Sequence, residues 1–182
     1  YQHVLGVTQD YKKAFEWFTK AAEQGDAHGQ FNLGYMYQNG NGVTKDYKKA
    51  VEWYTKSAEQ GFASGQFNLG TMYHNGYGVT KDDKKAVEWF TKAAEQGYAL
   101  GQCNLGLMYR FGRGVTKDLK KAVEWYTKSA EQGNAPGQYN LGYMYKNGYG
   151  VTQNRDQAVK WYTKAAEKRQ QKAIEALNGF RF

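Results

Sequence analysis

Hydrophobic and polar positions along this chain form a pattern that repeats every 36 residues. The tryptophans show the period, and they are Trp17, Trp53, Trp89, Trp125 and Trp161. Within one period, apolar residues between positions 50 and 58 recur at the spacing of one face of an α-helix, while Lys and Glu occupy the other face. Each period therefore predicts amphipathic helices rather than strands.

Turn residues divide each period into two helices. The first helix covers roughly residues 27–38 and ends at an Asn-Gly pair, which is typical of a left-handed helix end. The second helix begins after Asp46, a residue type that caps helix N-termini, and ends before Gly61. The same N-cap position is occupied by Asp10, Asp82 and Asp118. A helix pair of this size cannot bury its apolar face alone, so the periodicity predicts a stack of pairs, an α-solenoid.

The repeated unit also carries a recognisable motif. It reads A-x-x-x-N-L-G-x-M-Y-x-x-G-x-G-V-x-x-D-x-x-K-A-x-x-W-Y-x-K-A-A-E-x-G. This motif resembles the Sel-one-like repeat, a relative of the tetratricopeptide repeat. The resemblance implies adaptor or scaffold proteins whose first helices line a concave face. One departure is Gly29, with its equivalents Gly65, Gly101 and Gly137, where the family usually has Ala; the sequence offers no reason for it.

Together these observations predict an all-α fold, a right-handed α-solenoid of antiparallel helix pairs with a 36-residue period. The expected organisation is a partial repeat at 1–28 (the end of a first helix and a second helix), repeats at 29–64, 65–100, 101–136 and 137–169, and a capping helix at 170–182.

Composition narrows the class of protein. Hydrophobic residues make up 41% of the chain and aromatic residues 16%, which excludes a disordered chain. No apolar run approaches the roughly 18 residues of a membrane span, and no signal peptide is visible. The chain has no starting Met, and we expect it to be truncated at its N-terminus, so its localisation is left unassigned. One cysteine excludes an internal disulfide framework.

The positions that vary between otherwise identical repeats are the candidates for binding. On the first helices they change character from one repeat to the next, as a surface adapted to a ligand would; relaxed constraint at exposed sites is the alternative. An invariant Asn lies beside them, and its amide can either bind a peptide backbone or bond a neighbouring helix. The predicted partner-binding residues are His28, Phe31, Asn32, Tyr35, Gln38, Ser64, Phe67, Asn68, Thr71, His74, Leu100, Cys103, Asn104, Leu107, Arg110, Tyr139, Asn140, Tyr143 and Lys146.

Charge bears on the kind of partner. The formal net charge is +8, of which residues 101–136 carry +3 and residues 137–172 carry +5. An acidic peptide or phosphorylated segment is therefore a plausible partner of the C-terminal half. Most lysines lie beside Glu on the second helices, which is typical of a solvated face, so we do not expect nucleic-acid binding.

Catalytic chemistry has little support. No His, Cys, Asp and Glu cluster has metal-ligand spacing, and the glycine turns recur too regularly to be phosphate loops. We therefore expect no cofactor and no enzyme activity. His74 and Cys103 are the one possible nucleophile–base pair, and they support the alternative of a small-molecule or cell-wall-fragment binder with weak hydrolytic activity. A further alternative is a structural module that self-associates through an apolar helix face at residues 11–24.

Overall fold

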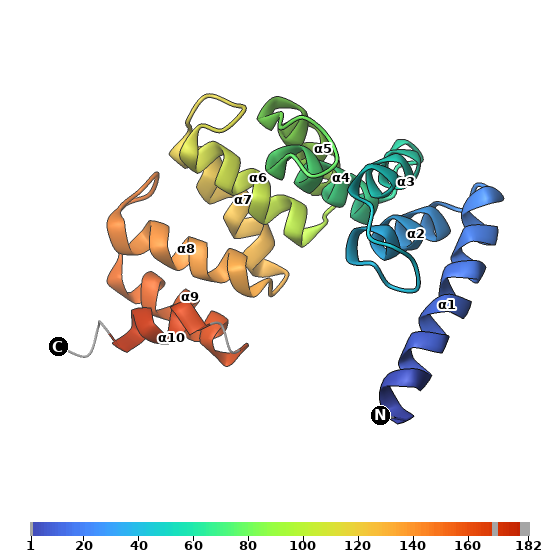
Figure 1. Ribbon diagram of the computed structural model, residues 1–182. Helices are drawn as coiled ribbons and strands as arrows, with labels where there is room; N and C mark the ends of the chain where they lie inside the picture. The colour runs from blue at the N-terminus through green and yellow to red at the C-terminus, as the bar shows by residue number, and fades with distance from the viewer. Residues whose placement is uncertain (1, 169–170, 179–182) are drawn as a thin grey trace. The chain divides into compact units, whose positions relative to one another are not determined.

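The computed structural model describes residues 2–168 and 171–178, and these residues form ten α-helices (Figure 1). The helices are α1 (Gln2–Glu23), α2 (Ala27–Asn39), α3 (Tyr47–Glu59), α4 (Ala63–Asn75), α5 (Asp83–Glu95), α6 (Ala99–Phe111), α7 (Leu119–Glu131), α8 (Ala135–Asn147), α9 (Arg155–Glu167) and α10 (Gln171–Asn178). The predicted all-α helical-repeat solenoid is confirmed. Residues 170 and 179–182 of the predicted capping helix lie outside the described residues.

The chain divides into two compact units, residues 1–89 and 90–182, with the boundary inside α5. In each unit a first helix packs against the second helix of its own repeat, as α2 does with α3 and α8 with α9. The second helix also packs against the next first helix, as α3 does with α4 and α7 with α8. Successive first helices touch directly, α2 with α4 and α6 with α8.

The helix ends lie where the turn residues predicted them. Gly40, with φ of 75°, closes α2 through a bond from its N–H to the Met36 carbonyl. Asp46 caps α3 by accepting hydrogen bonds from the backbone N–H groups of Lys48 and Lys49, at 3.0 and 3.1 Å. These two local signals fix the length of the turn and the direction in which the chain returns.

The first helix differs from the prediction. Instead of a helix end, a turn and a new helix capped by Asp10, α1 runs without interruption from Gln2 to Glu23. Val4 occupies the position at which the next repeat has Gly40. A β-branched residue strongly disfavours the positive φ that ends α2, so the helix continues through this segment.

Positions that are the same or nearly the same in every repeat build the core. Leu33, Met36, Tyr54 and Ala58 are buried. A Cβ on Gly34 would come within 2.8 Å of the Tyr54 ring, so this glycine allows α3 to approach α2. The Trp53 and Tyr37 side chains are only half-buried. At Trp53 the ring is half-buried and is covered by the Lys56 ammonium group, 4.1 Å from its centroid.

Close approach also explains the glycine at the start of each first helix. A Cβ on Gly29 would lie 2.7 Å from the Cβ of Ala21, and one on Gly137 would lie 2.5 Å from the Ser129 hydroxyl oxygen. The glycine therefore seats the first helix against the end of the preceding second helix. The adjacent buried glutamine reinforces this contact, since the Gln30 side-chain amide donates to the Ala22 carbonyl at 3.3 Å.

The last described helix packs on α9. Ala173 of α10 is fully buried in a cluster with Ala158, Tyr162 and Ala165. This helix therefore packs on the apolar side of α9, and its capping role stays a prediction. Lys168 stands where earlier repeats have Gln60, Gln96 and Gln132, and its ammonium group donates a hydrogen bond to the Gly133 carbonyl at 2.5 Å.

Candidate functional site

The predicted binding residues of the first unit lie at mixed depths. Tyr35 is 46% exposed and His28 is also exposed, whereas the other predicted residues of this unit are half-buried. Phe31 packs toward Tyr54 and Phe62, with ring centroids 5.9 and 5.4 Å away. In this unit Tyr35 and His28 are therefore the most accessible members of the set. The half-buried remainder is Phe31, Asn32, Gln38, Ser64, Phe67, Asn68, Thr71 and His74.

In the second unit two predicted residues are buried, and this corrects the sequence prediction. Cys103 is 3% exposed and Asn140 is 9% exposed. The two side chains meet, with the Asn140 amide 3.6 Å from the Cys103 sulfur. Cys103 also packs in the core between α6, α7 and α8, so these two residues cannot form an exposed binding face. The accessible members in this unit are Leu100 and Lys146, and the half-buried ones are Asn104, Leu107, Arg110, Tyr139 and Tyr143.

The invariant asparagines form different bonds in different repeats. The side-chain amides of Asn32 and Asn104 donate to carbonyls one turn back in their own helices, at 2.9 Å to His28 and 3.1 Å to Leu100. Each amide has a second N–H and a carbonyl oxygen, so such a bond leaves further capacity. Peptide capture by these asparagines stays a prediction.

The predicted nucleophile–base pair is unsuited to its role. Burial raises the pKa of the Cys103 thiol to about 11, while the bond from Asn140 opposes the rise. The thiolate that would act as nucleophile is thus scarce at neutral pH. His74 is engaged with Asp83, whose carboxylate oxygen lies 2.6 Å from its Nδ1. These contacts remove the basis for a hydrolytic site at this pair.

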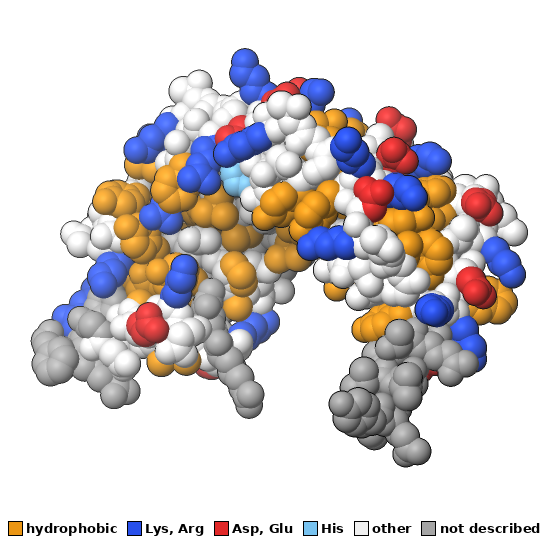
Figure 2. Space-filling view, viewed as in Figure 1, with side chains coloured by type: hydrophobic (Ala, Val, Ile, Leu, Met, Phe, Trp, Pro, Cys, Tyr) orange, Lys and Arg blue, Asp and Glu red, His pale blue; other side chains and the backbone are white. Residues whose placement is uncertain are grey.

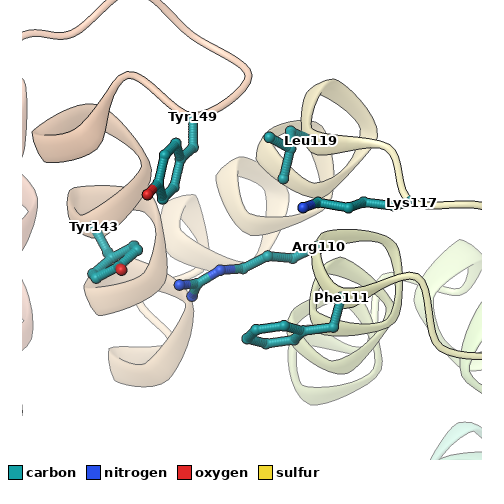
Figure 3. Close-up of a pocket in the computed structure, with 6 residues that line it drawn as sticks. All are labelled: Arg110, Phe111, Lys117, Leu119, Tyr143 and Tyr149. Atoms are coloured by element: carbon teal, nitrogen blue, oxygen red, sulfur yellow. The ribbon is translucent and has the colours of Figure 1, made fainter.

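A cavity with a charged lining lies in the second unit and has a volume of about 330 Å³. Its walls come from the end of α6, the turn after α6, the start of α7, α8 and the turn after α8 (Figure 3). The lining residues are Arg110, Phe111, Lys117, Leu119, Tyr143 and Tyr149. Two of them, Arg110 and Tyr143, belong to the predicted set.

Arg110 is held in this cavity by aromatic rings. Its guanidinium lies 4.2 Å from the Tyr143 ring centroid and 4.8 Å from that of Phe111. Figure 3 shows the side chain extended from α6 toward Tyr143, with Lys117 entering the same space from the turn. Contact with two rings restricts the motion of the guanidinium, and its N–H groups can still bind an anion in bidentate fashion.

The equivalent position in the first unit is filled. There Tyr47 stands in place of Leu119 and stacks on Tyr77, with centroids 5.0 Å apart and planes 12° from parallel. The Lys45 ammonium group lies 4.6 Å above the Tyr47 ring. In the second unit Tyr149 and Lys117 are retained, but Leu119 carries no ring to place between them. The cavity therefore results from the loss of one aromatic side chain.

The Arg110 substitution also leaves a hydroxyl group without a bond. In the first unit the Tyr54 hydroxyl donates to the Gln38 side-chain oxygen at 2.7 Å. Arg110 replaces that glutamine and has donors only. Among the described residues, the fully buried Tyr126 hydroxyl has no hydrogen-bond partner. Burial raises the pKa of Tyr126, and the nearby positive charge of Arg110 opposes the rise.

A second cavity, of about 200 Å³, lies between α1 and α2 in the first unit. It is mostly apolar, and Asn32 and Tyr35 of the predicted set contribute to its wall beside Tyr11 and Phe18. On the face shown in Figure 2, hydrophobic side chains reach the surface between Lys and Arg side chains. Both cavities thus combine accessible rings with residues that vary between repeats.

Four lining residues of the 330 Å³ cavity were not predicted, because they lie outside the first-helix columns whose variation was compared. The ends of the helices next to the turn vary as well. Phe111 stands where the other repeats have Asn39, Asn75 and Asn147, and Leu119 stands where they have Tyr47, Asp83 and Arg155. The same comparison of repeats, extended to the turns, would have found them.

Neither a metal site nor a membrane-spanning helix is present among the described residues. No group of three or more His, Cys, Asp or Glu side chains is placed there to hold a metal ion. No helix among those residues is long and apolar enough to cross a membrane.

Comparison with known proteins agrees with the fold. The Sel1 repeat model matches residues 2–26, 27–62, 63–98, 99–134 and 135–169. A protective antigen of uropathogenic Escherichia coli with an SLR fold is 42% identical over 90% of this chain, with a TM-score of 0.86, and this chain spans 35% of that protein. A Sel1 repeat protein from Oxalobacter formigenes is 38% identical, with 92% of this chain and 67% of that protein covered and a TM-score of 0.87.

More distant structures extend the comparison. An immunity protein of Pseudomonas aeruginosa is 26% identical, with 90% of this chain and 60% of that protein covered and a TM-score of 0.62. No curated protein matches the chain. The five matched repeats cover nearly all of the residues, so this chain belongs to the Sel1 repeat family of helical scaffolds.

Proposed function

We propose that this chain is a non-catalytic interaction scaffold, an adaptor that binds a peptide or protein partner on its first helices and the adjoining turns. The observation that carries the proposal is the contrast between a constant framework and a varying accessible surface. Leu33 and its equivalents are nearly fully buried in each repeat. Tyr35, in contrast, is 46% exposed and is replaced by Thr71, Leu107 and Tyr143 in the other repeats.

The exposed residues are of the kinds that anchor partners. Tyr and Arg are enriched among the residues that dominate interface energies, and exposed apolar side chains gain free energy when a partner covers them. Tyr35, Leu100 and Phe111 are each more than a third exposed. The excess positive charge between residues 101 and 172 favours an acidic segment of the partner at the second unit.

The relatives point in the same direction. One is described as a protective antigen and another as an immunity protein, and both descriptions are of proteins without a stated catalytic activity. This chain spans only part of each, so their roles support an interaction function for this chain in general terms alone.

The test is a comparison of captured partners. The chain, immobilised, is exposed to the proteins of its source, and the captured protein is identified and then measured with purified components. A variant with Tyr35→Ser, Arg110→Gln and Tyr143→Ser should lose at least about tenfold in affinity, because it removes three anchors. A control with Lys48→Ser and Glu52→Ser on the exposed side of α3 should bind like the parent. Equal binding by both variants would refute this placement of the surface.

The asparagines need a separate experiment. A double variant, Asn68→Ala with Asn104→Ala, should weaken binding of an extended peptide if their amides contact its backbone. The unfolding free energy is measured in parallel. Unchanged affinity in a folded variant would exclude peptide binding by the asparagine amides. This conclusion does not depend on the result for the Tyr35, Arg110 and Tyr143 variant.

Self-association is a second candidate, and one observation favours it. Trp17 on α1 is 71% exposed and Tyr11 is 43% exposed, whereas Trp161 in the second unit is 9% exposed. We propose that the apolar face at residues 11–24 packs on another helix, which in a purified sample would be a second copy. Light scattering should show dimers that Trp17→Ser abolishes. A monomer at high protein concentration would contradict this candidate.

A further inference from the structure

We propose that the cavity lined by Arg110, Lys117, Leu119 and Tyr149 binds an aromatic side chain of a peptide together with a carboxylate close to that ring. The proposal names the chemistry that one part of the partner must have, and in that sense it rests on the proposed function. Three observations carry it: a ring that is missing by comparison with the first unit, two cations, and the size of the cavity.

The first unit shows what the cavity is shaped to hold. The Tyr47 ring lies on Tyr77, 5.0 Å between centroids, and under Lys45 at 4.6 Å. The second unit retains the platform, Tyr149, and the cation, Lys117, but has no ring between them. A ring supplied by a ligand would thus regain the stacking and cation–π contacts that Tyr47 makes within the chain.

The frame around this space is the same in the two units. A Cβ on Gly78 would overlap the carbonyl oxygen of Tyr47, and a Cβ on Gly150 would overlap the carbonyl oxygen of Leu119. In both units the turn after a first helix is therefore seated on the start of the preceding second helix in the same way. The loss of the Tyr47 ring is not compensated by a closer approach of the turn.

The charge around the space selects an anion. The Arg110 guanidinium lies 4.2 Å from the Tyr143 ring centroid and 4.8 Å from that of Phe111, and Arg113 lies 5.3 Å from the Phe111 centroid. Lys117 has no acidic partner among the described residues. A carboxylate placed beside the ligand ring can accept two hydrogen bonds from Arg110 while Lys117 faces the ring.

The size of the cavity limits the ligand. Its volume of about 330 Å³ is at the lower end of the range for ligand pockets. It accommodates one aromatic residue with its neighbouring carboxylate and excludes a folded domain. The carboxylate can come from the C-terminus of a peptide or from an acidic residue next to the aromatic one, and the two sources place the same groups in the cavity.

The experiment uses three small probes and amide-resolved NMR of the whole chain. N-acetylphenylalanine carries a terminal carboxylate, N-acetyl-Asp-Phe-amide carries a side-chain carboxylate, and N-acetyl-Asn-Phe-amide is its uncharged match. We expect at least one charged probe to bind with a Kd on the order of 1 mM and to shift the signals around Tyr149. The neutral probe should bind about tenfold more weakly. Whichever charged probe binds better identifies the source of the carboxylate.

Two variants localise the binding. Leu119→Tyr restores the ring of the first unit and should displace all three probes, while Arg110→Gln should weaken only the charged ones. The Tyr side chain is already accommodated at this place in the first unit, so Leu119→Tyr is expected to fold. Lys84→Gln, an exposed position on α5, is the charge-matched control and should leave every probe unaffected.

The outcomes separate this inference from the proposed function. Absence of binding by all probes, equal binding of the neutral probe, or binding that Leu119→Tyr leaves intact would each overturn it. If no probe binds but the triple variant (Tyr35→Ser, Arg110→Gln and Tyr143→Ser) still loses affinity for the captured partner, only the inference is wrong. If the probes bind and no surface variant releases the partner, the cavity chemistry holds and the placement of the partner-binding surface is wrong.

Discussion

The turn after α4 and the turn after α8 have the same backbone arrangement and different surfaces. In the first unit the stacked rings of Tyr47 and Tyr77 fill the space beside the turn. In the second unit Leu119 and Tyr149 leave a cavity that Arg110 enters. The glycines, caps and buried leucines are common to both. A few side chains therefore decide whether this position is filled by the chain itself or is open to a ligand.

This difference shows how a repeat protein can acquire a cavity without altering its fold. The buried positions are constrained by neighbours on all sides, so they are nearly identical from repeat to repeat. The turn and outer first-helix positions contact fewer neighbours, and their replacement costs little stability. A feature such as the unbonded Tyr126 hydroxyl marks a place where the exchange disturbed the framework, because Arg110 cannot accept the bond that Gln38 accepts.

The largest expected effect tests the shared backbone frame. Gly78→Ala should lower the unfolding free energy by about 3 kcal/mol, because Ala at φ of 71° is strained and its Cβ overlaps the Tyr47 carbonyl. Gly150→Ala should cost about the same in the second unit. Gly61→Ala, at φ of 86° with no heavy atom within 4 Å, should cost only about 1 kcal/mol. Urea unfolding provides the measurement, and equal costs for Gly61 and Gly78 would contradict the close contact.

The next effect concerns the buried thiol of Cys103 in the second unit, which stands at the position of Phe31 and Phe67 in the first unit. With its pKa raised from 9.0 to about 11, Cys103 at pH 8 should react with iodoacetamide at least about 100-fold more slowly than an exposed cysteine. The rate should rise with pH toward 11, since the thiolate form is reached only there. Unfolding in urea should abolish the protection. Rapid labelling of the folded chain at pH 8 would show that the thiol is accessible.

A smaller effect compares the two tyrosine hydroxyls. Tyr54→Phe should cost about 1 kcal/mol, because it leaves the Gln38 oxygen without its donor. Tyr126→Phe should be neutral or stabilising, since it removes a buried hydroxyl that has no partner in the described residues. Phe90 occupies this position in the intervening repeat, so the framework accepts the change. Equal losses in the two variants would show that Tyr126 has a bond after all.

The smallest effect is the stability gained by filling the cavity. Leu119→Tyr should stabilise the chain by about 1 kcal/mol through a new stack on Tyr149. The reciprocal change, Tyr47→Leu, should destabilise it by a similar amount. Differences in the denaturant midpoint at constant m-value are the readout. A destabilising Leu119→Tyr would mean that the second-unit cavity does not match the Tyr47 environment.

Much of the fold could be predicted from the sequence because the period repeats the same local signals. Asp46 and Gly40 act through adjacent backbone groups, so their roles are visible without tertiary structure. The reason for Gly29 could not be predicted from the sequence, because it depends on how closely α2 lies against Ala21 of the preceding helix. The continuous α1 was not predicted, because Asp10 signals a helix start whereas Val4 stands where the next repeat has its helix-ending Gly40.

The candidate site was predicted only in part for a related reason. Arg110 and Tyr143 vary on a first helix and were identified by their variation. Cys103 varies too, but it points into the core, and variation alone does not distinguish a buried position from an exposed one. Phe111 and Leu119 were missed because turns were treated as connections.

If side-chain exchange on a constant framework creates the second-unit binding site, the same site can be built in the first unit. The variant for this test combines Gln38→Arg, Asn39→Phe, Tyr47→Leu and Thr71→Tyr in one chain. Amide-resolved NMR during titration with N-acetyl-Asp-Phe-amide should then show shifts around Tyr77 as well as around Tyr149. Shifts confined to Tyr149 in a folded variant would contradict the claim.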